Sequence, residues 1–224
     1  MEAIAERLKQ IESMDLSSGD HEDMAHGMCV MEATSFVAGE PWSDAPQCAC
    51  PVITAFLVSW NDSLPDAYRT RLLKPLVPLI VGTRSTKEVE ARRSYMALDW
   101  LIRVFTPRWL DMVPALHKHA KELRELDAIA DMAGAAAAGV KVNAAWDAAR
   151  AAARAAVWAA AGDAAWDAAW YAAGAAAGAA ARAAARDAAR DAAWDAAGDV
   201  LKPTTEWLQA SALNLVHQMI EVRP

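Results

Sequence analysis

The chain is dominated by a tetrapeptide that repeats fourteen times without interruption between Ala144 and Asp199. Its first two places are Ala in every copy except at Val157, its third is Trp, Arg or Gly, and its fourth is Asp, Ala or Tyr. Ala is the strongest helix former, 33 of these 56 residues are Ala, and no Pro interrupts them. The repeat therefore predicts helix along its whole length.

A period of four residues does not match the 3.6 residues of a helical turn. Each unit turns the third place by about 40°, so a straight helix of roughly 84 Å would carry its large side chains around every side. No single flat partner could cover that spiral. We therefore expect a break within Gly174 to Gly178, and a hairpin with antiparallel arms. The pairs that this hairpin would bring together are Trp170 with Arg182, Trp166 with Arg186, and Trp158 with Trp194.

Several interpretations of the repeat stay open. Its Trp side chains can fill a core against the N-terminal half, since each buries a large area. The whole tract can also be an expanded sequence that is kept because Ala-rich units form tolerable helix. Alternatively, indole faces stack on planar rings and guanidinium groups grip phosphate, which suits a small anionic, nucleotide-like ligand. The residues of that candidate ligand site are Trp158, Trp166, Trp170, Trp194, Arg182, Arg186 and Arg190.

Bulk composition excludes several classes of protein. A net charge of −7 argues against a protein that grips long nucleic acid, because phosphate binding needs a dominant basic face. The chain shows no signal peptide, and the repeat carries too many Arg and Asp to span a membrane. Three Cys without a secretion signal indicate reduced thiols. We expect a cytoplasmic protein with neither membrane nor long nucleic acid among its partners.

The N-terminal half carries a spacing typical of metal ligands. His26 and Cys29 stand three residues apart, and Cys48 and Cys50 form a Cys-x-Cys pair further on. Four such ligands suit a closed tetrahedral zinc site, so zinc is the candidate cofactor. Ordinary buried thiols are the alternative interpretation. A Cys-His nucleophile is disfavoured, because the sequence indicates no orienting third group.

Short motifs cover roughly residues 20 to 110. They are Met28 to Ala33 (MCVMEA), Ala38 to Asp44 (AGEPWSD), Cys48, Pro51 to Ile53 (PVI) and Asn61-Asp62. Together they resemble a family of uncharacterised proteins from high-GC bacteria and their phages, whose members often carry Ala-rich C-terminal segments. The resemblance implies that Cys29, Glu32, Cys48 and Asn61-Asp62 belong to one packed motif, and it implies no activity.

Gly and Pro divide the rest of the chain into expected helices. The expected spans are 24 to 37, 51 to 60, 66 to 73, 87 to 105, 106 to 126, and 204 to 222 after a break at Lys202-Pro203. The acidic cluster Asp20 to Asp23 is expected to be a solvated helix start, and Asn61 to Pro65 a loop. Helical spacing assigns two sets of side chains to the core. They are Ala97, Leu98, Leu101, Ile102 and Phe105, and Leu208, Ala212, Leu215, Val216, Met219 and Ile220.

These patterns predict an all-α protein, a helical bundle with a C-terminal Ala-rich helical hairpin. The helical body covers residues 1 to 133, and the repeat helices with a closing helix cover 134 to 224. For function we expect a non-enzymatic protein that binds or sequesters a small anionic nucleotide-like ligand through Trp and Arg. One alternative is a structural protein that forms homo-oligomers through closely packed Ala and Gly helices. A second alternative is a metal-dependent enzyme at Cys29, Glu32 and Cys48.

Overall fold

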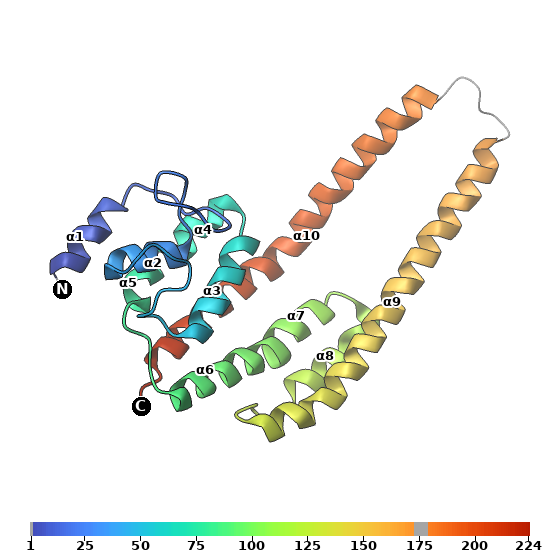
Figure 1. Ribbon diagram of the computed structural model, residues 1–224. Coiled ribbons are helices and arrows are strands. Elements are labelled where there is room, and N and C mark those ends of the chain that lie inside the picture. The colour runs from blue at the N-terminus through green and yellow to red at the C-terminus, as the bar shows by residue number, and fades with distance from the viewer. Residues whose placement is uncertain (1, 173–178) are drawn as a thin grey trace. The chain divides into compact units, whose positions relative to one another are not determined.

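The computed structural model describes the backbone of residues 2 to 172 and 179 to 224, and the side chains of residues 3 to 155 and 199 to 224. All regular structure in these ranges is helical, which confirms the all-α prediction (Figure 1). The α-helices are α1 Glu2–Gln10, α2 Val30–Ala38, α3 Pro51–Ser63, α4 Asp66–Leu73, α5 Val77–Ile80, α6 Lys87–Trp100, α7 Thr106–Leu110, α8 His117–Arg124, α9 Met132–Ala172 and α10 Ala179–Glu221. Shorter helical turns are η1 Lys74–Leu76, η2 Leu101–Phe105 and η3 Pro114–Leu116. Among the described helices we find none whose length and hydropathy would let it span a membrane.

The repeat is helical wherever its backbone is described. Helix α9 runs from Met132 through the first repeat units to Ala172, and α10 takes up the repeat again at Ala179. The predicted break within Gly174 to Gly178 lies outside the described residues. The Trp and Arg side chains that would pair across the hairpin also lie outside the described side chains, so the hairpin stays a prediction.

Two compact units divide the chain. The first contains the residues up to Asp99, with Ile129–Asp131 and Ala212–Pro224, and the second contains Trp100–Ala128 and Met132–Ser211. This division differs from the expected one near residue 133. The difference arises because the end of α10 packs with the N-terminal residues and not with the repeat.

The core of the first unit surrounds α2, which contacts α1, α3 and α5. Helix α2 is buried on almost every side, and its buried polar residues Glu32, Thr34 and Ser35 are hydrogen-bonded. It ends at Gly39, as predicted, because Gly39 adopts a left-handed φ of 80° and its N–H caps the carbonyl of Phe36. Buried apolar residues of α3, α4, η1 and α5 complete the core of this unit: Ile53, Leu57, Leu73, Leu76, Val77 and Ile80.

The last turns of α10, from Ala212 on, belong to the first unit. The predicted buried face is confirmed for Leu208, which belongs to the second unit, and for Ala212, Leu215, Val216 and Met219, whereas Ile220 is partly exposed. The predicted break at Lys202-Pro203 is wrong, because α10 continues through Pro203. An internal Pro costs a helix about 3 kcal/mol. The packing of the buried face after Pro203 offsets that cost.

The second unit has its own apolar core between α7, α8, η3 and the beginning of α9. Its buried members are Leu110, Leu116, Ala120, Leu123 and Ala145. Leu101 was expected in a core, but 46% of its surface is exposed. The other four expected members, Ala97, Leu98, Ile102 and Phe105, are half-buried. Leu101 begins η2, a π-helical turn, which departs from the α-helical spacing on which the prediction was based.

Two other helix boundaries differ from the predictions. The helix expected from residue 24 begins only at Val30, and residues 24 to 29 form turns and irregular backbone. Helix α3 continues through Ser63, although Asn61 to Pro65 was expected to be a loop. Arg69 explains the longer helix: its Nε donates to the Asn61 carbonyl at 2.8 Å and its Nη2 to the Leu64 carbonyl at 2.5 Å. These bonds satisfy carbonyls that a helix end otherwise leaves unpaired.

Candidate functional site

A capping box between Cys29 and Glu32 opens α2. The Cys29 Sγ accepts the N–H of Glu32 at 3.4 Å, and Glu32 Oε2 accepts the N–H of Cys29 at 2.7 Å. Both side chains are buried. A carboxylate at this position is favoured by the positive end of the helix. The capping box alone therefore fixes the position of the Glu32 carboxylate.

Glu32 also binds His21, which the sequence had assigned to a solvated cluster. The His21 N–H donates to Oε1 at 2.6 Å, and the ring Nδ1 lies 2.8 Å from Oε2. The other ring nitrogen, Nε2, lies 2.9 Å from Ser17 Oγ. A carboxylate accepts hydrogen bonds, so Nδ1 is the ring nitrogen placed to donate to Glu32, and Nε2 is placed to exchange a hydrogen bond with the Ser17 hydroxyl. Ser17, His21 and Glu32 thus form a hydroxyl, imidazole and carboxylate array.

The backbone closes tightly around this array. The Met28 N–H donates to Ser17 Oγ at 3.0 Å, and the Ser17 N–H donates to the Met28 carbonyl at 2.9 Å. Gly27 has a φ of +131°, and a Cβ there would stand 2.4 Å from His21 Cδ2 and 2.8 Å from Ser17 Oγ. Trp42 Nε1 donates to the His21 carbonyl at 2.8 Å. The loop from Ser17 to Met28 is therefore ordered by specific bonds and tolerates only Gly at residue 27.

Asn61 and Asp62 tie the same loop to α3. Asn61 Nδ2 donates to the Ser17 carbonyl at 2.8 Å, and Asp62 Oδ1 accepts the N–H of Gly19 at 2.8 Å. The bond from Gly19 is the main reason why the pKa of Asp62 lies below its usual value. The structure thus brings together Cys29, Glu32, Asn61 and Asp62 around the start of α2. Cys48 belongs to a separate turn, where its carbonyl accepts the Arg84 N–H at 2.9 Å.

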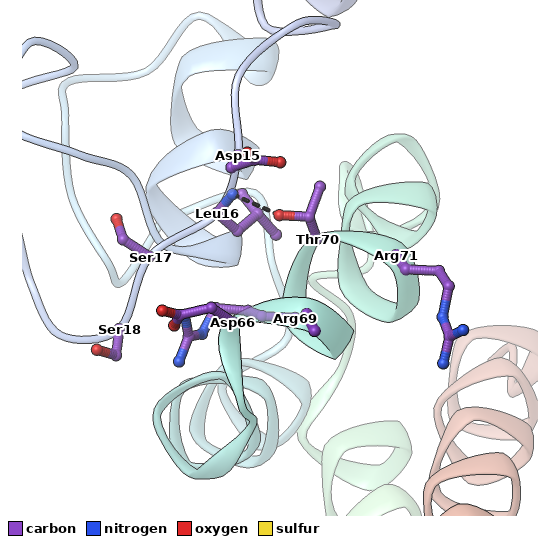
Figure 2. Close-up of a pocket in the computed structure, with 9 residues that line it drawn as sticks. Asp15, Leu16, Ser17, Ser18, Asp66, Arg69, Thr70 and Arg71 are labelled. Carbon is purple, nitrogen blue, oxygen red and sulfur yellow. Dashed lines mark hydrogen bonds and ion pairs between the residues drawn. The ribbon is translucent and has the colours of Figure 1, made fainter.

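A pocket of about 780 Å³ opens beside this loop (Figure 2). It is lined by Asp15, Leu16, Ser17, Ser18, Asp66, Ala67, Arg69, Thr70 and Arg71. The Leu16 N–H donates to Thr70 Oγ1 at 2.8 Å across one wall. Arg69 is buried, and its guanidinium is already bonded to Asp66 and to carbonyls of the chain. A phosphate that binds Arg69 would have to break those bonds, so Arg69 is poorly placed to bind an anion.

The four expected zinc ligands lie in different surroundings. His26 is exposed, and its Nδ1 lies 2.8 Å from Asp23 Oδ1. Cys29 is the capping residue described above, and burial raises the pKa of its thiol to about 12. Burial also raises the pKa of Cys48. Cys50 is buried, and its N–H donates to Thr83 Oγ1 at 3.0 Å. Within the described residues no three His, Cys, Asp or Glu side chains are placed to hold a metal ion, so the structure does not bring these four together.

The candidate ligand residues of the repeat cannot be compared with the structure in the same way. The side chains of Trp158, Trp166, Trp170, Trp194, Arg182, Arg186 and Arg190 lie outside the described side chains. Trp146, in the first repeat unit, is described, and 63% of its surface is exposed. This member of the Trp series therefore does not fill a core.

A second pocket, of about 330 Å³, lies within the second unit next to Trp146. We call it the aromatic pocket. It is lined by Leu101, Ile102, Phe105, Thr106, Trp109, Leu110, Leu123, Val142, Ala145, Trp146 and Ala149. None of these lining side chains carries a charge. Phe105 and Trp109 meet edge to face with ring centroids 6.2 Å apart, and Thr106 Oγ1 donates to the Leu101 carbonyl at 2.8 Å.

The sequence interpretation missed both the array of Ser17, His21 and Glu32 and the aromatic pocket. Ser17 and His21 stand in a segment rich in Ser, Gly and Asp, which is typical of a solvated loop. The available signal was Gly27, since a Gly within a loop often permits a close approach of backbone and side chain. The aromatic pocket depends on a π-turn, which helical periodicity alone does not indicate.

Comparison with protein-family models, with curated proteins and with solved structures gave no match to this chain.

Proposed function

We propose that this protein is a binding protein that holds one small, uncharged aromatic or apolar molecule in the aromatic pocket. The main support for this proposal is the size of the pocket. Ligand pockets generally measure about 300 to 1,000 Å³ and are mostly apolar, and this one measures about 330 Å³. Its volume suits a molecule of one or two rings.

The lining favours an uncharged ligand. Moving a charge out of water is costly unless a partner compensates it, and the lining residues supply no charged partner. The edge-to-face pair of Phe105 and Trp109 offers ring faces and edges to a third ring. Binding of a nucleotide-like anion would instead depend on the Arg side chains of the repeat. That expected ligand site is different from the aromatic pocket.

The π-turn supports the choice of this pocket over the others. Turns of this kind recur at functional sites, because they move side chains out of the register of the flanking helix. Here η2 contributes Leu101, Ile102 and Phe105 to the lining. The same turn leaves Leu101 about half exposed at the rim, where a ligand could cover it.

A neutral fluorescent probe tests the proposal on the full chain. We expect N-phenyl-1-naphthylamine to bind one site per chain, with little dependence on salt because the probe carries no charge. Removal of the rim indole by Trp146→Ala should weaken binding about ten-fold or more. The matched control is Trp207→Ala, because Trp207 is also a large, exposed side chain of the second unit, at 47%, and does not line the pocket.

A filling variant provides the second arm of the experiment. Ala149→Leu places a larger side chain at the wall of the pocket and should block the probe while the helix content stays unchanged. Equal binding by the Trp146→Ala and Trp207→Ala variants, or probe uptake unaffected by Ala149→Leu, would refute the proposal. Displacement of the probe by adenosine monophosphate, weakened by salt, would favour the anionic ligand instead.

A further inference from the structure

The array of Ser17, His21 and Glu32 has the order of groups that activates a serine. Ser17 Oγ lies 2.9 Å from His21 Nε2, and His21 Nδ1 lies 2.8 Å from Glu32 Oε2. Such an order provides a nucleophile, a base within hydrogen-bond reach of it, and a third group that orients the base. The array lies in the first unit and is independent of the aromatic pocket.

Each member of the array is held by further bonds. Glu32 accepts the N–H groups of Cys29 and His21 in addition to the ring, so its carboxylate cannot turn away. The Met28 N–H donates to Ser17 Oγ at 3.0 Å, and the two acceptors within reach of the hydroxyl proton are His21 Nε2 at 2.9 Å and the Met28 carbonyl at 3.4 Å. The contact with His21 is the shorter of the two, and Nε2 can accept the proton when Nδ1 donates to Glu32.

The approach to Ser17 limits the size of a reagent. Ser17 is partly exposed and stands at the edge of the pocket in Figure 2. Its hydroxyl points away from Asp66 and Arg69 in that view, and the His21 side chain is 10% exposed. Small, flexible electrophiles fit such an approach, whereas a folded protein substrate does not.

We infer that Ser17 is an activated nucleophile that captures acyl or phosphonyl groups from small activated esters. In the reaction Ser17 Oγ forms a bond to the carbonyl carbon or to phosphorus, and the bond to the leaving group breaks. The hydroxyl proton passes to His21 Nε2 and from there to the leaving group. Glu32 acts as a positioning residue that stabilises the charged ring.

Capture should be much faster than release. Three backbone N–H groups close to Ser17 Oγ are already used inside the loop: Ser17 donates to Met28, Gly19 to Asp62, and His21 to Glu32, so none of these three is free to stabilise an oxyanion. A covalent label is therefore the appropriate measurement, and steady turnover is not required.

A fluorophosphonate linked to biotin tests the inference with the full chain. We expect one adduct per chain, formed with loss of fluoride and located at Ser17 by peptide mapping. Ser17→Ala should abolish the adduct, whereas Ser18→Ala, which changes the neighbouring serine of the same pocket, should leave the rate unchanged. If Ser17→Ala fails to fold, the residue that carries the adduct in the unaltered protein still shows whether Ser17 is the nucleophile.

Glu32→Gln tests the positioning role. The rate of labelling should fall about 100-fold or more, because general-base assistance contributes about that much. Nitrogen NMR of the His21 ring should show the tautomer change, which distinguishes loss of orientation from simple unfolding. A known serine hydrolase in the same tube serves as the positive control. The inference would be overturned if that enzyme is labelled and this protein is not. It would also be overturned by an adduct that maps to another residue and persists in Ser17→Ala.

Discussion

Arg93 Nε donates a 2.7 Å hydrogen bond to the carbonyl of Met219, 126 residues further along the chain. The same guanidinium donates to the Thr83 carbonyl at 2.6 Å and to the Val222 carbonyl at 3.0 Å. A buried cation here meets the negative end of α10, whose last carbonyls have no partner within the helix. Through this one side chain the C-terminal turns are held in the first unit.

Replacement of Arg93 by Met should therefore destabilise the first unit strongly. The variant leaves three carbonyls without their donor, and we expect the free energy of unfolding to fall by about 3 to 5 kcal/mol. Urea denaturation followed by circular dichroism measures the change. Arg92→Met is the matched control, since Arg92 is exposed on the same helix, and it should change stability by less than about 0.5 kcal/mol. Equal effects of the two changes would contradict the assigned role.

Gly27 offers a second comparison within one loop. Gly27 has a positive φ, and the Cβ of Gly27→Ala would also lie 2.4 Å from the His21 ring carbon Cδ2. Gly19 has a positive φ of +84°, but the Cβ of Gly19→Ala would have no atom within 4 Å. The change at Gly19 should cost about 1 kcal/mol from backbone strain alone. The change at Gly27 should cost clearly more, because His21 or Ser17 must also move. Thermal unfolding of the two variants gives the difference, and a smaller loss at Gly27 would show that the loop is looser than described.

Cysteine reactivity should follow burial. The pKa of Cys29 is raised to about 12, so the reactive thiolate is almost absent at pH 8, and the thiol is also shielded. We expect iodoacetamide to modify Cys48, which is partly exposed, well before Cys29 in the folded protein. Mass spectrometry over time measures both sites. Early modification of Cys29 would mean that the capping box opens readily.

The raised pKa of Cys29 also predicts how the stability of the folded chain changes at high pH. The unfolded Cys29 thiol ionises near the ordinary value of 9.0, below the value of about 12 in the folded chain. Folding therefore favours the protonated thiol, and this contribution is complete below pH 9 and is lost as the pH rises from there. Cys29→Ser keeps a capping side chain without a titrating thiol. That variant should lose less stability between pH 8 and pH 11 than the unaltered chain does, as urea denaturation at each pH would measure.

Helix ends and buried faces were the features that local chemistry could predict. Gly39 ended α2 and Pro51 began α3 as expected, because left-handed φ and the first helical position favour those residues. The apolar positions of α10 from Leu208 to Met219 are buried as their spacing indicated. Features that depend on partners distant in sequence were missed. Arg69 lengthens α3, and the packing of α10 carries that helix through Pro203.

The candidate sites were less predictable for the same reason. His21 lies next to acidic residues in sequence, and only the fold places it against Glu32 instead of solvent. The thiols at Cys29 and Cys50 resembled ligands by spacing, yet each is buried in a different contact. The aromatic pocket takes Leu101, Ile102 and Phe105 from a π-turn, which the α-helical periodicity of the sequence does not indicate.

Asp62 provides the last prediction, which concerns acid. Its Oδ1 accepts the Gly19 N–H at 2.8 Å, and this bond lowers the pKa of the carboxyl below its ordinary value of 3.8. A depressed pKa means that the folded chain favours the ionised form. The resulting stability is present above pH 3.8 and is lost as the pH falls through the lower folded value. Asp62→Asn should flatten the decline of stability in that acid range, and Asp20→Asn is the control, because Asp20 is an exposed carboxylate of the same loop. Urea denaturation between pH 2.5 and pH 5 measures both slopes, and equal slopes in the two variants would show that the Gly19 bond does not form in solution.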